Sequence, residues 1–147
     1  MQRVFCEERK KDISMDAGLI TPFTDLIGEC RTIDEFMGIT PSDNIEEIVE
    51  RGNALIVYIN RTGKMLADAK YHLNTVRKSD IMRIIGEIIP EKLSAKVQNT
   101  LVDTSALEQQ FLVDWCERLN RTAVHQLDWM RSLISKAKVE MQTGLNN

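Results

Sequence analysis

Three glutamates at the start of a helical pattern have a spacing that could bind a metal ion. Glu46 and Glu47 are adjacent, and Glu50 follows three positions later. Carboxylates one helical turn apart point to the same side of a helix, where their oxygens can bind a hard cation such as Mg²⁺. A matching acidic pair on a second helix would surround the cation and complete a metal or catalytic site.

The first half of this pattern resembles the all-α nucleotide pyrophosphohydrolases of the MazG kind, which combine E-E-x-x-E with E-x-x-D one helix later. The second half is missing here, because Asp68 is a single acid with Lys70 close by. Glutamates in a first helical turn are also explained by the positive end of the helix dipole. We therefore predict that the chain is not an enzyme, holds no metal ion or cofactor, and has no evident small-molecule substrate.

Cysteine and histidine do not form a ligand pattern either. Cys6, Cys30 and Cys116 are odd in number and far apart in the sequence, whereas a structural zinc site needs about four ligands clustered in sequence. A dyad of Cys116 with His125 would be poorly spaced for nucleophilic catalysis. Reduced thiols, with His72 and His125 as packed or surface residues, are the favoured interpretation.

Charge is unevenly distributed along this chain of net charge −3. Residues 1–50 carry 12 acids and 5 bases, residues 51–98 carry 9 bases and 4 acids, and residues 99–147 carry 5 bases and 6 acids. An acidic leader beside a basic middle favours either pairing within the protein or a surface for a polyanion. The candidate nucleic-acid-binding residues, which lie mostly off the apolar seam described next, are Arg61, Lys64, Lys70, Arg77 and Lys78.

A long helix is predicted to begin at Pro41-Ser42-Asp43-Asn44 and to cover about Asn44–Lys78. Ser, Asp and Asn side chains accept hydrogen bonds from the free N–H groups at a helix start. Small or apolar residues then recur at intervals of three and four, which is the heptad seam of helices packed side by side. The seam comprises Ile45, Ile48, Gly52, Leu55, Ile59, Thr62, Leu66, Ala69, Leu73 and Val76.

A second seam of the same kind predicts a last helix over about Thr104–Gln142. Ser105, with Glu108 three positions later, has the pattern of a capping box that opens this helix. The seam continues from Leu112 to Met141, again at intervals of three and four. We therefore expect an all-α fold, an antiparallel hairpin of two long amphipathic helices.

Shorter helices are expected before and between the long ones. Thr24 and Thr32 are predicted to cap two of them, and the recurring glycines and prolines argue against a longer helix there. Ser79-Asp80 is predicted to cap another, which ends at Pro90. These short helices are expected over residues 25–30, 33–37, 81–89 and 91–101. The chain is thus divided into an acidic N-terminal segment with short helices, residues 1–43, and a helical hairpin domain, residues 44–147.

Apolar residues outside the seams bear on solvation and assembly. The longest apolar run, Ala54–Ile59, has six residues, far short of the roughly 20 that a membrane-spanning helix needs. Acidic residues interrupt the N-terminus before a signal-peptide core forms, so we expect a cytoplasmic protein with no membrane partner. A second apolar surface lies off the seams and must be covered by other segments or another subunit, which favours a homo-oligomer. It comprises Val49, Ile56, Val57 and Met65 of the first long helix and Phe111, Trp115 and Trp129 of the last.

The order of these features resembles the phage UvsY recombination mediators. A long first helix with basic residues, a short apolar turnaround and a last helix follow one another over residues 44–140. The stretches that carry the resemblance are Asn53–Arg77, Leu112–Cys116 and Trp129–Ser135. The resemblance implies a small, oligomeric, helical protein that binds single-stranded DNA and helps to load a recombinase onto it.

Two functions are therefore weighed. The first is a non-enzymatic accessory protein that binds single-stranded DNA in phage-type recombination or replication, through the bases of residues 51–98. The alternative is an oligomeric helical structural or adaptor protein without a nucleic-acid role. The arrangement of those bases discriminates between the two functions. Bases that gather on one exposed face can follow a phosphate backbone, and such a face would favour DNA binding.

Overall fold

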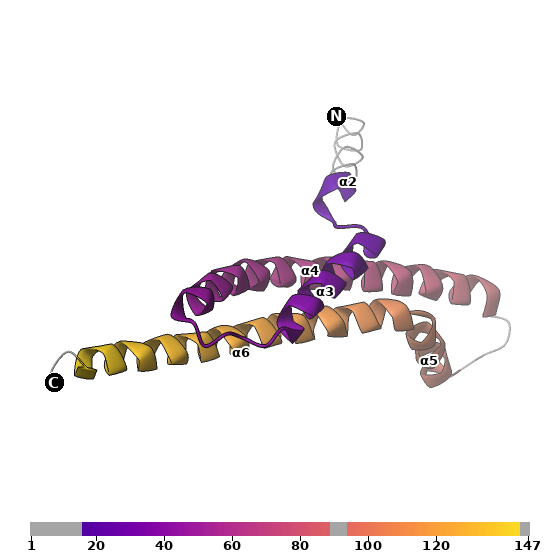
Figure 1. Ribbon diagram of the computed structural model, residues 1–147. Coiled ribbons are helices and arrows are strands. Elements are labelled where there is room, and N and C mark those ends of the chain that lie inside the picture. The colour runs from indigo at the N-terminus through magenta and orange to yellow at the C-terminus, as the bar shows by residue number, and fades with distance from the viewer. Residues whose placement is uncertain (1–15, 89–93, 145–147) are drawn as a thin grey trace, which may run out of the picture.

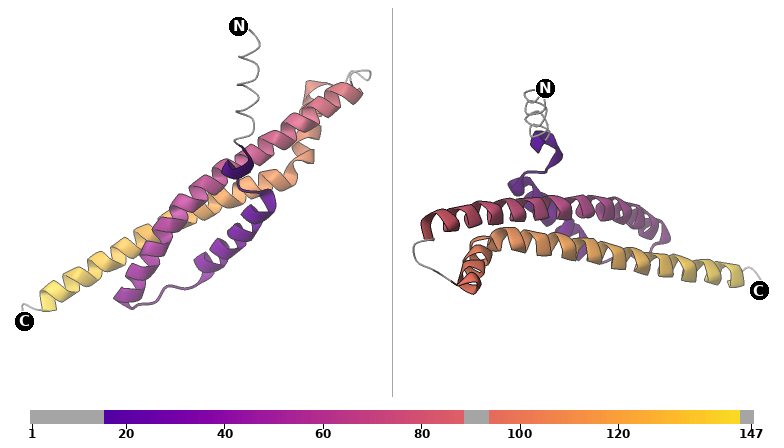
Figure 2. Two further views of the ribbon diagram at one scale, coloured as in Figure 1. Left: turned by 90° about the horizontal axis from the view of Figure 1, so that it is seen from above. Right: turned by 180° about the vertical axis from the view of Figure 1, so that it is seen from behind.

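The computed structural model describes residues 16–88 and 94–144, and their regular structure is helical throughout. The helices are α2 (Asp16–Leu19), α3 (Phe23–Gly38), α4 (Ile45–Ile88), α5 (Ala95–Ser105) and α6 (Leu107–Gly144). The long helices α4 and α6 run antiparallel, side by side, and α3 crosses and contacts both of them (Figures 1 and 2). The predicted all-α class and hairpin of two long helices are confirmed.

The start of α4 is the one that its sequence predicts. Asn44 Oδ1 accepts a hydrogen bond from the backbone N–H of Glu46 over 2.8 Å, and Ser42 Oγ accepts one from the N–H of Asn44 over 3.1 Å. Glu46 and Glu47 occupy the first turn, where the helix dipole favours negative charge. The helix start is therefore explained by capping alone.

The predicted break at Ser79-Asp80 is wrong, because α4 continues for 44 residues to Ile88. No glycine or proline stands between Gly63 and Gly86. Because no residue ends the helix before Ser79, no new helix begins there for Ser79 and Asp80 to cap. The Asp80 carboxylate instead accepts a hydrogen bond from the Ser105 hydroxyl of α5. The predicted end at Pro90 lies outside the described residues.

The boundary between α5 and α6 also differs from the prediction. The proposed capping-box residue Ser105 and its neighbour Thr104 belong to the end of α5. The Thr104 hydroxyl donates to the backbone oxygen of Thr100 over 2.7 Å, and Ser105 Oγ lies 2.8 Å from the backbone oxygen of Val102. Both residues are helical and part of α5, so neither stands at the N-cap position directly before α6. α6 begins at Leu107, after the buried turn residue Ala106. α5 begins at Ala95, and the start predicted at residue 91 lies outside the described residues.

One helix, α3, replaces the two short helices predicted over residues 25–30 and 33–37. Thr32 caps nothing, because its hydroxyl donates to the backbone oxygen of Gly28 over 3.2 Å. A buried face at intervals of four, three and four makes the helix continuous, since tertiary packing overrides the low helix propensity of glycine. The buried residues of α3 are Leu26, Cys30, Ile33 and Met37.

A single apolar core joins α3, α4 and α6. The predicted seam faces inward in α4, where Leu55 and Ala69 are fully buried, and in α6, where Leu119 and Ala123 are. At the end of the α6 seam, Met141 is instead 61% exposed. The buried face of α3 belongs to the same cluster. The helices thus form a rigid frame, and the groups available for binding lie on its outside.

Candidate binding surfaces

Three of the five basic residues proposed to bind nucleic acid are bonded within the protein. The guanidinium of Arg61 forms a two-pronged ion pair with the Glu29 carboxylate of α3. Lys64 is paired with Asp68 and also donates from Nζ to the backbone oxygen of Leu19 over 2.7 Å. These contacts hold both cations against the N-terminal segment, away from a phosphate backbone.

Arg77 is likewise engaged, on another side of α4. Its Nη2 lies 3.3 Å from Asp103 Oδ1 of α5 and 3.3 Å from Gln110 Oε1 of α6. Lys70 and Lys78 are exposed, and within the described residues neither has an ion pair or a hydrogen bond. The five bases therefore do not gather on one exposed face.

The connection between α2 and α3 is fixed to α4 at Thr21. Its N–H donates to Asp68 Oδ2 over 3.1 Å, its carbonyl oxygen lies 2.8 Å from His72 Nε2, and its hydroxyl accepts from Arg61 over 3.2 Å. We refer to Thr21, Asp68, His72 and Arg61 as the Thr21 anchor. In it the N–H, the carbonyl and the hydroxyl of Thr21 each contact a side chain of α4. The anchor sets where α3 enters and therefore where α3 lies on α6.

Asp68 is the buried charge of this anchor, with only 2% of its side chain exposed. Burial alone would raise the pKa of Asp68, but the hydrogen bonds from Lys64 and Thr21 outweigh burial and lower it. The carboxylate therefore stays charged and keeps both bonds. Sequence reasoning missed this role because Asp68 was considered only as half of a metal motif.

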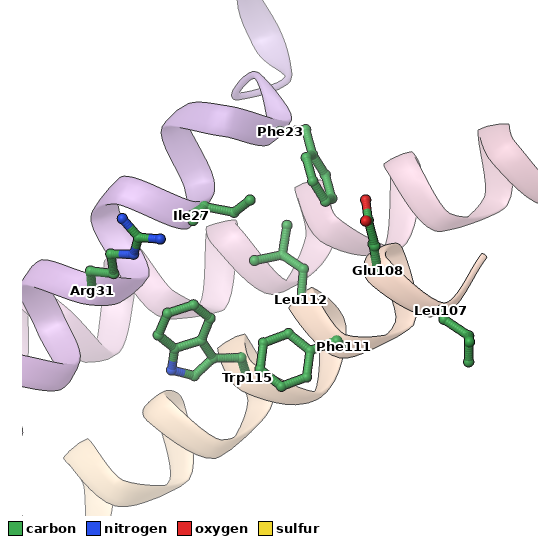
Figure 3. A pocket seen from close by; sticks show the side chains of 8 residues that line it. All are labelled: Phe23, Ile27, Arg31, Leu107, Glu108, Phe111, Leu112 and Trp115. Atoms are coloured by element: carbon green, nitrogen blue, oxygen red, sulfur yellow. The ribbon is translucent and has the colours of Figure 1, made fainter. Parts of the chain in front are cut away.

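An apolar groove lies between α3 and α6 (Figure 3). Phe23 and Ile27 of α3 form one wall, and Leu112 and Trp115 belong to the α6 wall. The hollow measures about 480 Å³, and Phe111 on its α6 side is 64% exposed. The complete lining is Phe23, Ile27, Arg31, Leu107, Glu108, Phe111, Leu112 and Trp115.

Two aromatic rings form a wall of this groove. The rings of Phe111 and Trp115 lie 5.8 Å apart, tilted by 50°, one turn apart on α6. Beyond them is a second hollow that includes Asp34 and Arg118, whose side chains form an ion pair of 2.9 Å. The groove thus has apolar walls and charged surroundings, an arrangement that suits apolar side chains of a macromolecule better than a polar small molecule.

The sequence predicted half of this groove. Phe111 and Trp115 were identified as apolar residues off the α6 seam that something else must cover. α3 covers part of Trp115, which is half-buried against the core, but leaves Phe111 open. The α3 wall was missed because Phe23 lay outside both of the short helices expected there.

Two cysteines from distant parts of the chain meet in the core. Cys30 Sγ of α3 lies 3.6 Å from Cys116 Sγ of α6, and both are buried free thiols. The hydrogen-bonded contact with Cys116, together with burial, raises the pKa of Cys30. Neither side chain is exposed to solvent, so the pair packs α3 against α6 inside the core.

The acidic cluster of Glu46, Glu47 and Glu50 is exposed on the first turns of α4. Among residues 16–88 and 94–144, no group of three or more His, Cys, Asp or Glu side chains is arranged to hold a metal ion. In the same residues, no helix has the length and apolar character to cross a membrane.

No match to this chain was found among family models, curated proteins or solved structures. Its surfaces are therefore the basis on which a function can be assigned. Two surfaces bear on the functions considered from the sequence. One is the groove between α3 and α6, and the other is formed by the exposed cations of α4.

Proposed function

We propose that this protein is a non-enzymatic accessory protein that docks another protein in the apolar groove between α3 and α6. The observation that carries the proposal is the exposure of Phe111, a large aromatic residue beside Trp115 and opposite Phe23. Clustered aromatic side chains on a surface are typical of binding interfaces, whereas scattered single apolar residues are not.

The occupant that fits is an amphipathic helix. A groove between two helices receives apolar side chains spaced three and four positions apart on the helix that lies in it. Arg31 and Glu108 contribute opposite charges to the lining. A partner helix with an acidic end near Arg31 and a basic end near Glu108 complements both charges and is thereby oriented.

Tryptophan fluorescence tests this proposal. The chain has two tryptophans, so a Trp129→Phe variant leaves Trp115 in the groove as the only one. The probe is a synthetic amphipathic helix with leucines at intervals of three and four, glutamates at one end and lysines at the other. We expect the peptide to shift Trp115 emission to shorter wavelength, because it displaces water from the indole.

A peptide of the same composition in scrambled order is the control. Scrambling removes the apolar stripe but keeps the charge, so it should leave Trp115 emission unchanged. Equal responses to the two peptides would show that the groove does not select a helix.

Binding of single-stranded DNA in phage-type recombination or replication is the second candidate. The observation that favours it is the exposure of Lys70 and Lys78 in the basic middle of the sequence. Two such cations can contact a phosphate backbone without reading its sequence. A recombinase would then be the protein partner, as the resemblance to the UvsY mediators implies.

A further inference from the structure

The thiols of Cys30 and Cys116 are 86 positions apart in the sequence and in contact between α3 and α6. Their Sγ atoms lie 3.6 Å from each other, and both side chains are fully buried. The sulfurs of a disulfide are about 2.0 Å apart, so the two atoms need to approach by roughly 1.6 Å to form one. Small rotations of the two side chains, together with a slight tilt of α3, can supply a movement of this size.

The polar contacts that hold α3 on the long helices are open to water. The ion pairs Glu29–Arg61 and Asp34–Arg118 lie on either side of Cys30 in the sequence, and at least a third of each of these side chains is exposed. Pairs of this kind each contribute little to stability. A helix of 16 residues held in this way opens locally more readily than the long hairpin unfolds. A covalent bond from Cys30 to α6 would prevent that opening.

The cysteine pair lies directly behind the apolar groove. Arg31, which follows Cys30 in the sequence, lines the groove from α3, and Trp115, which precedes Cys116, lines it from α6 (Figure 3). A bond between the two sulfurs therefore ties together the two helices that form the groove walls.

We propose that Cys30 and Cys116 are a redox-sensitive pair, which a hydroperoxide converts into a disulfide that locks α3 onto α6. Thiols reduce the bond and release the lock. The structure described above is the reduced form, with two free thiols. This inference does not rest on the proposed function, because the lock acts on α3 whatever the groove binds.

The reaction takes two steps and consumes one molecule of peroxide. The contact with Cys30 lowers the pKa of Cys116, which favours the thiolate at this sulfur as the first nucleophile. Cys116 Sγ attacks one peroxide oxygen and the O–O bond breaks, which leaves a sulfenic acid on Cys116 and releases the other oxygen as water.

The second step uses the short distance between the sulfurs. Cys30 Sγ attacks the sulfur of the Cys116 sulfenic acid, the S–O bond breaks, and the oxygen leaves as a second water with the Cys30 proton. Two thiols and one peroxide thus give one disulfide and two waters, and the two sulfurs supply the two electrons that reduce the peroxide.

Burial of the pair selects the class of oxidant. Hydrogen peroxide is small and uncharged, so it can reach the sulfurs during brief local openings of α3. Oxidised glutathione is bulky and charged, and thiol–disulfide exchange with it requires an accessible sulfur. At equal concentration, peroxide should therefore oxidise the folded protein at least about tenfold faster than oxidised glutathione does, whereas glutathione should gain most when urea unfolds the chain.

Mass spectrometry of the full chain tests bond formation. In a Cys6→Ser background the pair holds the remaining thiols. After treatment with peroxide, the protein is unfolded in urea and exposed to iodoacetamide. We expect neither cysteine to be alkylated and the chain mass to be lower by two hydrogens, and dithiothreitol should restore both thiols. The matched control, Cys30→Ala in the same background, leaves Cys116 without a partner and should gain oxygen instead of forming a bond within the chain.

Two results of this experiment would overturn the proposal. In the first, both thiols of the folded chain remain open to alkylation at a peroxide concentration that oxidises the chain unfolded in urea, which would make the pair inert core packing. In the second, oxidation joins two chains on a non-reducing gel, which would show that the two thiols prefer partners in another molecule.

Thermal unfolding and hydrogen exchange test the lock itself. The bond joins residues 86 positions apart, so it restricts the unfolded chain and should raise the midpoint of thermal unfolding by on the order of 10 °C. Amides of α3 should exchange about tenfold more slowly after oxidation, because local opening is blocked. Dithiothreitol should reverse both changes, and peroxide should produce neither in the Cys30→Ala control. An unchanged midpoint and unchanged α3 exchange in a chain whose mass shows the bond would contradict the lock.

Discussion

Asn120 of α6 donates a hydrogen bond from Nδ2 to Thr62 Oγ1 of α4 over 2.9 Å, in the middle of the packed seam. The same amide donates to the backbone oxygen of Ile59 over 3.0 Å. Thr62 is fully buried, and its own hydroxyl donates to the backbone oxygen of Tyr58 over 2.7 Å. A satisfied polar contact within an apolar seam favours one register of the two helices over others.

Replacing Asn120 by alanine should therefore destabilise the hairpin. The substitution leaves the buried Thr62 oxygen without its donor from α6, which costs about 1–2 kcal/mol. Urea unfolding followed by circular dichroism measures the change in the free energy of unfolding.

Arg121→Ala is the matched control for this experiment. It removes an exposed ion pair with Glu117 one turn away on the same helix, which contributes about 0.5 kcal/mol or less. Equal losses for the two variants would show that the buried contact has no special role.

Gly28→Ala should stabilise the protein. Gly28 lies exposed inside α3, and a Cβ built there meets no atom within 4 Å. Alanine in a helix interior is favoured over glycine by about 0.5–1 kcal/mol, so the midpoint of thermal unfolding should rise. A lower midpoint would mean that α3 does not form a continuous helix through residue 28.

Stability should fall in acid through Asp68. The folded protein lowers the pKa of Asp68, so this group contributes stability that is fully present above the unfolded value of about 3.9. That contribution disappears as the pH falls through the lower folded pKa, where the carboxylate becomes protonated. Urea unfolding of the wild type and of Asp68→Asn, from neutral pH to about pH 2, measures the difference.

The stability difference between wild type and Asp68→Asn should be largest near neutral pH and shrink in acid. Asp25→Asn is the control, because Asp25 is exposed in the first turn of α3. It should follow the wild-type curve more closely. A difference for Asp68→Asn that does not change with pH would contradict the anchoring role of the charged carboxylate.

The bases of α4 make a separate prediction for single-stranded DNA. If DNA follows the exposed side of α4, Lys70→Glu with Lys78→Glu should weaken binding to all sequences. The salt slope should fall by about 0.7 for each phosphate that the variant no longer neutralises. Fluorescence anisotropy of a labelled oligonucleotide, measured at several salt concentrations, gives both quantities.

Arg118→Glu with Arg131→Glu on α6 is the control of equal charge change. Both arginines are exposed, so a general loss of positive charge would weaken binding in either double variant. Indistinguishable binding curves for the two would mean that α4 has no specific contact with DNA. Arg61 and Lys64 should contribute little in either case, since α3 and the Thr21 anchor hold them.

Local patterns in the sequence were sufficient to predict α4, α6 and their seam. The start of α4 at Asn44 follows from side chains within two positions, and the seam follows from spacing along one helix. Errors arose where a local signal competed with packing, as at Ser79-Asp80, which resembles a cap but lies inside a helix. Whether these residues cap a helix depends on contacts with α5, which is distant in the sequence and absent from any short stretch around Ser79.

The candidate surfaces were harder to predict, because each depends on a contact between distant residues. Arg61 appears free in the sequence, and its partner Glu29 lies 32 positions away. The groove likewise needs Phe23 beside Leu112, a neighbourhood created only when α3 crosses α6. Net charge and periodicity describe each helix separately, so they cannot predict which residues of two different helices come into contact.

Docking of a helix in the α3–α6 groove is tested most directly by calorimetric affinities of the amphipathic peptide for two aromatic variants. Phe111 is 64% exposed in the groove and Trp129 is 59% exposed elsewhere on α6, so Phe111→Ser and Trp129→Ser remove comparable apolar surface. We predict that Phe111→Ser weakens peptide binding by about tenfold or more, as expected for an aromatic anchor, and that Trp129→Ser leaves it nearly unchanged. Equal affinities of the two variants, or a larger reduction for Trp129→Ser, would contradict the assignment of this groove as the docking site.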